Sequence, residues 1–369
     1  MATNKEQNKL NVPHLRFPEF HGEWEKCKLG DIAEFSTARI SSVKLDCKNY
    51  VSTENMLQDF QGVVEAKSVP NETNVISFTC GDILISNIRP YLKKVWKATF
   101  DGGCSSDVFV LQATDTVAKD YLHYAVANDK FINYVMSGAK GVKMPRGDKN
   151  QMRTYQLSLP SIQEQYKIAK LLTLLDERIA TQSKLIEKLE SLIKGIAQKI
   201  VRCNKPNVRL SECLECKSST LQESDVYEQG TYPVYGANGI VGYLDNYNAE
   251  SEAVYIIKDG SGVGTVSYVT GKCSATGTLN TLQAKDGYSL QYFYYLLKVF
   301  NFEPYKTGMA IPHIYFKDYG NALFFCPSYT EQLQYARLFF AIDSKLSAEQ
   351  NIKTNISLQK QYLLREMFI

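Results

Sequence analysis

The chain has 369 residues, of which 44% are hydrophobic and 22% are charged, and its formal net charge is +3. This composition is close to the globular average and excludes a fibrous or wholly disordered protein, while the length predicts two domains. No apolar run is long enough to predict a membrane span, and the polar first nine residues lack the apolar core of a signal peptide. We therefore expect a cytoplasmic protein.

Taken in chain order, residues 1–160 predict a first α+β unit. Short β-like runs punctuated by Gly and Asn are typical of strands, and a longer periodic apolar run is typical of a helix. The expected strands are residues 75–78, 82–86, 94–98 and 108–112, and the expected helix is residues 122–136.

Residues 161–205 predict a long helix. Apolar residues recur in alternating steps of four and three, with a polar interruption at Gln182, which is the pattern of a heptad seam. Ser161 is expected to cap this helix, with Glu164 completing a capping box, and Pro206 follows its end. The expected seam consists of Leu175, Ile179, Ile186, Leu189, Ile193, Ile196 and Ile200.

Residues 206–326 predict a second α+β unit, with strands at 232–235, 254–257, 265–269 and 279–283 and a helix at 290–299. Residues 327–369 predict a second long helix. Each helix of about 40 residues would be longer than a small domain is wide, so we expect the two helices to pack together as an antiparallel coiled coil. The alternative is that each apolar stripe covers a local core. The second stripe is looser, with polar Glu349 and Gln359 between its apolar members, which are Leu338, Ile342, Leu346, Ile352, Ile356, Leu363 and Met367.

An internal repeat organises the chain. The motif Pro160-Ser-Ile-Gln-Glu-Gln165 recurs as Pro327-Ser-Tyr-Thr-Glu-Gln332, 167 positions later, and Pro145 and Pro312 have the same offset. Further upstream, Tyr121-Leu-His-Tyr124 resembles Tyr292-Phe-Tyr-Tyr295, and Leu111-Gln-Ala113 equals Leu282-Gln-Ala284. The chain is therefore predicted to be a tandem duplication of a globular unit followed by a helix, with boundaries at 1–160, 161–205, 206–326 and 327–369.

The longer catalytic motifs are missing, and nuclease-like D/E-x-K tripeptides such as Asp46-Cys-Lys48 and Glu215-Cys-Lys217 are of a kind that is frequent by chance. None of the eleven prolines are adjacent, which excludes the N/D-P-P-Y/F motif of an adenine methyltransferase, and the sequence has no P-loop and no H-E-x-x-H. Cys213 and Cys216 form the only C-x-x-C pair among nine cysteines, so reduced structural thiols are expected and no metal site. We expect no catalytic residues and no cofactor on this chain.

Four features resemble the specificity subunits of Type I restriction-modification enzymes. They are the opening Asn11-Val-Pro-His-Leu-Arg-Phe-Pro-Glu-Phe-His-Gly-Glu-Trp24, the stretch Lys28-Leu-Gly-Asp-Ile32, the two helix starts at Pro160 and Pro327, and Tyr232-Pro-Val-Tyr-Gly-Ala-Asn-Gly-Ile-Val-Gly-Tyr243. The resemblance implies two target-recognition domains that read a bipartite sequence in double-stranded DNA. It also implies docking of two methylation subunits and of restriction subunits, which would use S-adenosylmethionine, ATP and Mg.

Candidate DNA-binding residues lie in basic and Gly-rich stretches, because Lys and Arg contact phosphates, and Arg or Asn can reach base edges. The second unit, with 8 basic against 12 acidic residues over 206–326, is expected to rely more on hydroxyl and amide groups. The candidates are Asn87, Arg89, Lys93, Lys94, Lys140, Lys143 and Arg146 in the first unit, and Tyr235, Asn238, Lys258, Ser261, Lys306, His313, Tyr315 and Lys317 in the second.

Two other functions remain open from the sequence. One is a duplicated-domain coiled-coil adaptor that binds protein or glycan, which suits the 24 tyrosines and the weak net charge. The other is the recognition portion of a fused restriction-methylation enzyme, which the missing motifs disfavour. DNA affinity that rises steeply as salt is lowered would separate the DNA-binding function from the adaptor.

Overall fold

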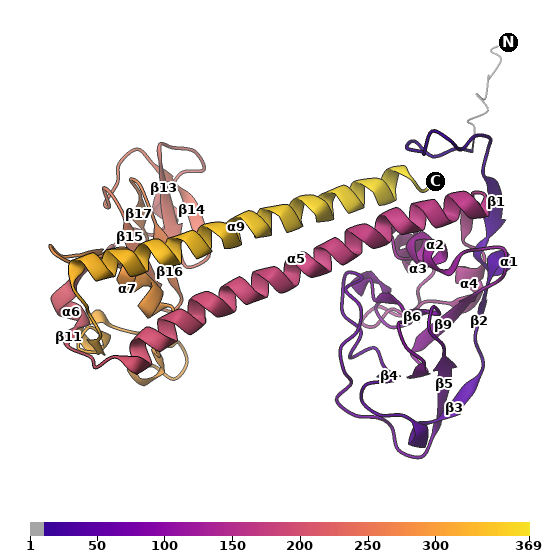
Figure 1. Ribbon diagram of the computed structural model, residues 1–369, viewed down its shortest axis with the longest axis horizontal. Helices are drawn as coiled ribbons and strands as arrows, with labels where there is room; N and C mark the ends of the chain where they lie inside the picture. The colour runs from indigo at the N-terminus through magenta and orange to yellow at the C-terminus, as the bar shows by residue number, and fades with distance from the viewer. Residues whose placement is uncertain (1–10) are drawn as a thin grey trace, which may run out of the picture. The chain divides into compact units, whose positions relative to one another are not determined.

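The computed structural model describes residues 11–369 (Figure 1). It contains two compact units: unit 1 combines the chain up to Thr181 with Lys353–Ile369, and unit 2 is Gln182–Ile352. The two long helices, α5 (Ile162–Cys203) and α9 (Tyr329–Glu366), each contribute residues to both units. The division of the chain at the helix ends stays a prediction.

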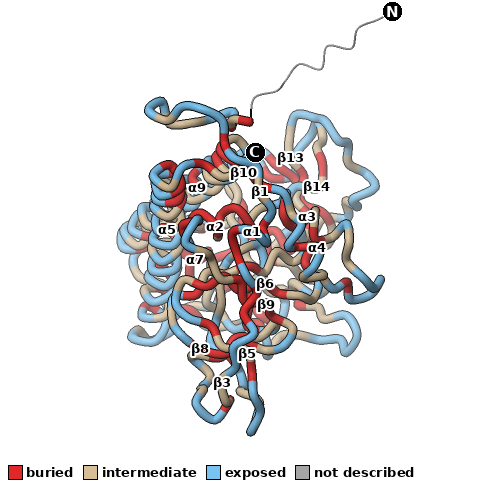
Figure 2. The backbone as a smooth tube through the Cα atoms, turned by 90° about the vertical axis from the view of Figure 1, so that its right-hand side faces the viewer, coloured by how far each residue is buried: buried red, intermediate tan, exposed pale blue. Residues whose placement is uncertain are grey.

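The central sheet of unit 1 contains its most buried strands. All four residues of β6 are buried, as are the first four of β9, because these strands are almost continuously apolar and are covered on both faces (Figure 2). Every pairing in this sheet is antiparallel. Its order is β2 (Ala33–Phe35), β9 (Val108–Ala113), β6 (Ile83–Ser86) and β7 (Val95–Lys97).

A second sheet and a short ladder complete the strands of unit 1. The second sheet has the order β3 (Arg39–Ser41), β5 (Asn74–Phe78), β8 (Gly102–Cys104) and β4 (Tyr50–Val51), and the ladder joins β1 (Glu25–Lys28) to β10 (Gln156–Leu159). The short helices are α1 (Leu29–Ile32), α2 (Lys119–Val126), α3 (Asp129–Ser137) and α4 (Lys149–Arg153), with 3-10 turns at Ser42–Lys44 and Pro90–Leu92.

The single helix predicted at residues 122–136 is wrong, because the structure has two helices there. Asn128 has an extended backbone and accepts a hydrogen bond from the Phe131 amide, so it caps α3 and ends the preceding turn. Asn128 therefore starts a second helix within an apolar run that looks periodic throughout. The periodicity alone did not reveal this boundary.

Unit 2 repeats this architecture. Its main sheet has the order β12 (Leu214–Ser218), β18 (Leu279–Ala284), β15 (Ala253–Ile257) and β16 (Val266–Val269). A three-stranded sheet has the order β14 (Gly239–Leu244), β13 (Tyr232–Gly236) and β17 (Ser274–Ala275), and β11 (Val208–Arg209) pairs with β19 (Leu323–Phe324). Its helices are α6 (Leu210–Cys213), α7 (Leu290–Leu297) and α8 (Phe316–Tyr319), with 3-10 turns at Glu223–Asp225 and Glu303–Tyr305.

The two main sheets have equivalent strand orders, so the sequence repeat is also a topological repeat. In each, the first strand follows a one-turn helix, α1 or α6, and pairs with the strand that precedes the next short helix, α2 or α7. The predicted α+β class with two duplicated units and long helices is confirmed.

The long helices pack antiparallel within each unit. In unit 1 the first part of α5 shares a core with the end of α9, where Leu172 and Leu363 belong to one cluster and Lys360 donates to Asp176 at 2.5 Å. In unit 2, Ile193 and Phe339 share a core. Of the predicted seam, Ile193, Ile200, Leu346, Ile356 and Leu363 are buried, and Leu175, Ile179, Ile186, Leu189, Ile196 and Ile342 are partly buried.

Two members of the second apolar stripe are misplaced by the sequence prediction. Leu338 is 47% exposed and Ile352 is 38% exposed, whereas Phe339 is buried instead; the polar Glu349, which was expected to interrupt this stripe, is buried within it. Glu349 accepts a hydrogen bond from the side-chain amide of Gln182. The polar interruption of one seam is thus paired with a polar residue of the other, which satisfies both buried groups.

The capping box predicted at the start of α5 forms only in part. The Ser161 hydroxyl accepts from the Glu164 amide at 3.4 Å, but the Glu164 carboxylate binds Arg16 through two hydrogen bonds of 2.8 Å. This buried carboxylate raises the pKa of Arg16. In α9 the box is complete, because Glu331 accepts from both the amide and the hydroxyl of Ser328.

No helix within residues 11–369 is long and apolar enough to cross a membrane. Over the same residues, no group of three or more His, Cys, Asp or Glu side chains could hold a metal ion. All nine cysteines are free thiols, and burial raises the pKa of Cys213 to about 12 and that of Cys216 to about 11.

Candidate nucleic-acid interface

In each unit, a buried glutamine at an equivalent position of the repeat joins the unit to a long helix. In unit 1, the Gln165 side chain accepts from the Ala118 amide at 2.8 Å and donates to the Pro160 carbonyl at 2.9 Å. In unit 2, Gln332 accepts from the Ser289 amide at 2.9 Å and donates to the Pro327 carbonyl at 3.0 Å. The glutamine of the repeated motif therefore ties the start of each long helix to the start of a short one.

Two tyrosines reinforce this joint in each unit. Tyr121 donates to the Ser158 carbonyl at 3.1 Å, and Tyr292 donates to the Phe325 carbonyl at 2.9 Å. Tyr124 donates to Asp176 at 2.8 Å, and its counterpart Tyr295 donates to Asp343 at 3.4 Å. The residues that are repeated in the sequence are therefore the ones that hold each unit on its helices. The strand ends and loops take no part in this joint, so their sequences can differ between the units.

One loop in each unit returns to the end of the central strand that precedes it; we call residues 138–147 and 305–314 the matched loops. In unit 1 the Arg89 amide donates to the Pro145 carbonyl at 2.8 Å, and the Gly147 amide donates to the Asn87 carbonyl at 3.0 Å. Lys140 and Arg146 pair through both backbone hydrogen bonds. The two basic clusters among the candidate residues of unit 1, at 87–94 and 140–146, therefore meet at one place, beyond the end of β6.

The cations at this place are partly restrained by acids. Arg146 is an exposed residue and pairs with Asp107 at 3.3 Å, and Lys140 lies 3.6 Å from Asp148. Lys143 is exposed at the loop's outer part. Such exposed pairs contribute little to folding, so their cations are available to an external anion.

Arg89 and Asn87 differ from ordinary surface residues at this place. Arg89 is exposed, and its backbone is left-handed with φ at 52°, an uncommon conformation for a residue with a β-carbon. The Asn87 side-chain oxygen is buried and accepts no hydrogen bond within the described residues. Backbone strain and orphaned polar atoms concentrate at functional sites.

Lys93 and Lys94 are held by internal partners. Lys93 pairs with Asp129 at 2.8 Å, and Lys94 donates to the Thr53 carbonyl at 2.6 Å. Burial lowers the pKa of Lys94. These contacts restrain both side chains, and both residues are only half-exposed, so the more exposed Arg89, Lys143 and Arg146 are the stronger candidates for DNA contacts.

Unit 2 docks its matched loop with the same backbone bonds. The Gly260 amide donates to the Pro312 carbonyl at 3.0 Å, the Ile314 amide donates to the Lys258 carbonyl at 2.9 Å, and Thr307 pairs with His313. Lys258 and His313 thus correspond in position to Asn87 and Arg146, and Ser261 is exposed just beyond them.

The side chains around this second loop also pair with acids or aromatic rings. The His313 ring lies 3.3 Å from Asp259, and Lys306 donates to Glu303 at 2.6 Å. The Lys317 ammonium lies 5.4 Å from the centre of the Tyr315 ring, and Tyr315 is 46% exposed. His313, Tyr315 and Lys317 therefore form one group of titratable, aromatic and cationic side chains.

Tyr235 and Asn238 belong to a different sheet. Tyr235, on β13, packs against Tyr255 with ring centres 5.6 Å apart, and burial raises its pKa. Asn238 is exposed in the turn between β13 and β14. Tyr235 is half-buried and packs against the core of this sheet.

Sequence reasoning missed the two acids that hold the matched loops, Asp107 and Asp259. It also missed the role of Arg16, which ties the opening motif to α5. The sequence offered a signal only for Asp259, whose position directly after the predicted strand 254–257 and Lys258 places it at a strand end.

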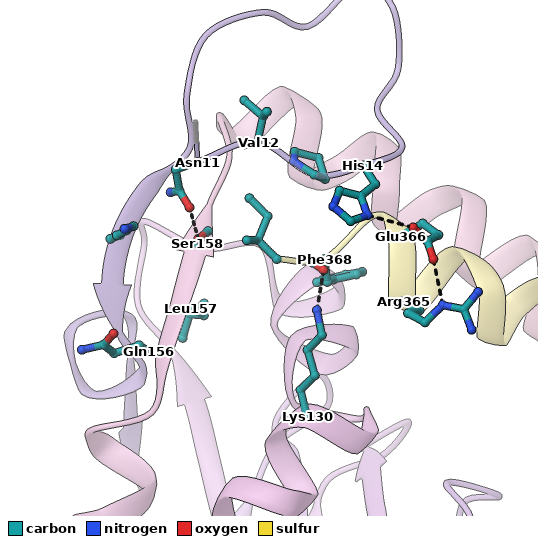
Figure 3. Close-up of a pocket in the computed structure, with 13 residues that line it drawn as sticks. Asn11, Val12, His14, Lys130, Gln156, Leu157, Ser158, Arg365, Glu366 and Phe368 are labelled. Atoms are coloured by element: carbon teal, nitrogen blue, oxygen red, sulfur yellow. Dashed lines mark hydrogen bonds and ion pairs between the residues drawn. The ribbon is translucent and has the colours of Figure 1, made fainter. Parts of the chain in front are cut away.

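A cavity of about 490 Å³ in unit 1 lies beside this opening motif (Figure 3). Around it, Ser158 donates to Asn11 at 3.0 Å, and Lys130 donates to the Phe368 carbonyl at 2.8 Å. His14 pairs with Glu366, and hydrogen bonds from Arg365 and His14 lower the pKa of that carboxyl. The cavity is thus bordered by contacts that fasten residues 11–16 and the end of the chain to unit 1.

Comparison with known proteins agrees with this duplicated architecture. The model of the Type I restriction modification DNA specificity domain matches residues 21–191 and again residues 205–358. The two matches cover most of the chain, and the chain belongs to this family.

Individual relatives are distant. The chain is 27% identical over 214 residues to the Type I restriction enzyme MjaVIII specificity subunit of Methanocaldococcus jannaschii, which covers 54% of this chain and 46% of that protein. It is 23% identical over 202 residues to the EcoDI specificity subunit of Escherichia coli, covering 53% of this chain and 45% of that one. The matched stretch thus spans about half the length of these relatives.

One solved structure shares the fold over nearly the whole chain. The crystal structure of the Type I restriction-modification S subunit from M. genitalium superposes with a TM-score of 0.69 at 17% identity, covering 97% of this chain and 99% of that one.

Proposed function

We propose that the chain is the non-catalytic DNA-specificity subunit of a Type I restriction-modification complex. Each unit reads one half of a bipartite target in double-stranded DNA. The long helices scaffold two methylation subunits and, where cleavage occurs, restriction subunits; those partners supply the S-adenosylmethionine, ATP and Mg chemistry.

The observation that carries this proposal is the matched loop. Two units with the same anchors to the helices present, beyond equivalent strand ends, loops whose basic side chains differ: Lys140, Lys143 and Arg146 in one and Lys306 and His313 in the other. A shared scaffold with different reading groups suits a protein that binds two unlike half-sites.

Exposed apolar side chains on the long helices support the scaffolding role. Leu174 and Leu192 on α5, and Phe340 and Leu358 on α9, are between 48% and 57% exposed. Apolar surface of this kind marks protein contacts, and helices of a partner subunit could cover it.

Paired substitutions in the two loops test the half-site assignment. The double variant with Lys143→Ala and Arg146→Ala should change the first half-site alone. The double variant with His313→Ala and Lys317→Ala should change the second half-site alone. Loss of a base contact should relax one base position by about 1–3 kcal/mol, whereas loss of phosphate contacts should weaken all sequences and reduce the salt dependence by about one unit per contact. Methylome sequencing of cells that express each variant with its methylation subunit gives the motif, and salt titration of binding gives the slope.

Lys44 and Lys48 to Ala is the matched control, because both side chains are exposed in unit 1 and lie outside the loop. An unchanged motif and salt slope in both loop variants would remove the matched loops from the DNA interface. DNA binding by the wild-type chain that does not depend on salt would favour the adaptor function instead.

A further inference from the structure

The most exposed apolar side chains of the matched loops occupy equivalent positions. Val142 is 99% exposed and Met309 is completely exposed. They lie 167 positions apart, which is the offset that relates Pro145 to Pro312 within the same loops. A second apolar pair follows two residues later, where Met144 is 49% and Ile311 is 59% exposed.

The backbone before these residues is also equivalent. Gly141 has φ of 95° and Gly308 has φ of 88°, a left-handed conformation that glycine adopts without strain. In both loops, a β-carbon on the glycine would approach the carbonyl oxygen three residues further on, that of Met144 or Ile311. The two loops therefore make the same tight turn, with an apolar residue directly after its glycine.

Folding does not account for these apolar tips. A side chain that stays in water gains no free energy from burial, so neither Val142 nor Met309 stabilises its unit. Isolated surface hydrophobics are common, but here the same exposed position is apolar in both units although the neighbouring cations differ. That repetition indicates a shared external contact.

The surroundings of the tips favour nucleic acid as that contact. Lys140 and Lys143 flank Val142, and Lys306 and His313 flank Met309. Lysine and histidine side chains on both sides of a protruding tip can donate hydrogen bonds to phosphates while the tip between them reaches the bases. Apolar side chains meet DNA bases either at the thymine methyl group or at the face of an opened base step.

We propose that Val142 and Met309 are base-contacting tips, one for each half of the DNA target, that bind the apolar surface of a base. This inference rests on the proposed DNA-specificity function and adds to it an apolar contact, distinct from the cationic residues of the same loops.

Val142→Ser and Met309→Ser, each made in the full chain with its methylation subunit, test the tips. Each variant should bind the target about 5- to 100-fold more weakly, with the change confined to one half-site. The salt slope should stay at the wild-type value because no phosphate contact is lost, whereas Lys143→Ala should reduce it. Val43→Ser, which alters another exposed apolar residue of unit 1, should leave affinity and motif unchanged.

Modified DNA separates the two apolar surfaces. If the tip contacts a methyl group, deoxyuridine in place of one thymine should reproduce the loss for the wild-type protein and remove the difference between wild type and variant. If the tip enters a base step, 2-aminopurine at that step should brighten with wild type and not with the variant.

If the wild-type complex bound its target and both Ser variants kept the wild-type affinity and motif, the proposal that the tips contact bases would be wrong. The proposed function would remain intact. If a Ser variant no longer bound the methylation subunit but bound DNA as tightly as wild type, the proposal would also be wrong, because the tips would then contact protein. Failure of the wild-type complex to bind any duplex would instead refute the proposed function.

Discussion

Gln332→Leu is expected to destabilise unit 2 by about 2–6 kcal/mol. The substitution keeps the side chain's approximate size but leaves the Ser289 amide and the Pro327 carbonyl without their partner, and each orphaned buried group costs about 1–3 kcal/mol. Gln332 is only 2% exposed, so water cannot replace it without opening the joint. The first turn of α7 should lose protection against hydrogen exchange, because Ser289 is its cap.

Hydrogen-exchange mass spectrometry with chemical denaturation measures both effects. Gln165→Leu should act in the same way at α2 in unit 1, while Gln334→Leu, at an exposed position of α9, should leave the stability nearly unchanged. Wild-type protection of α7 in the Gln332 variant would show that the repeated glutamine is not a structural joint.

The second prediction concerns the spacing of the DNA half-sites. Four residues inserted after Ala180 in α5, together with four after Ile352 in α9, should lengthen the gap between half-sites by one or two base pairs. Four helical residues add about 6 Å, and one base pair occupies about 3.4 Å of the duplex axis. They also turn the helix by about 400°, one full turn plus about 40°, which a supercoil can absorb.

Both helices must be lengthened because the pairs on either side of the insertion fix their register. Asp176 with Lys360 lies on one side, and Gln182 with Glu349 lies on the other. Insertion in α5 alone would bring one of these pairs out of register, so that variant should lose methylation. Methylome sequencing of the double insertion reads the gap directly. An unchanged gap with full methylation, or altered bases in either half-site, would show that the helices do not set the spacing.

The sequence predicted those elements that are encoded locally. The central strands β6, β9 and β15 are short, nearly continuous apolar runs, and the heptad steps of α5 identify its seam without knowledge of the partner. The strands β1 and β2 were missed because each is short and pairs with a segment far along the chain. Such pairings depend on tertiary contacts that no local pattern contains.

The candidate site divides in the same way. The basic clusters could be found because their members are near one another in sequence, and the repeat identified the matched loops. Which cations are internally paired could not be found, because Asp129, Thr53 and Asp107 reach Lys93, Lys94 and Arg146 only in the folded unit. The stripe of α9 was misassigned at Leu338 because the adjacent Phe339 fits the helix face better, a distinction that needs the packing partner.

Unit 1 is assembled from two separate stretches of chain, and this has a consequence for biosynthesis. Its core includes Leu363 and Met367, and the ring of Phe368 stacks on Tyr121 with centres 5.2 Å apart. A ribosome therefore makes all of unit 2 before it makes the residues that complete unit 1. Unit 2 can close its core first, and a nascent chain interrupted near Ile352 would carry a formed second unit and an unfinished first one.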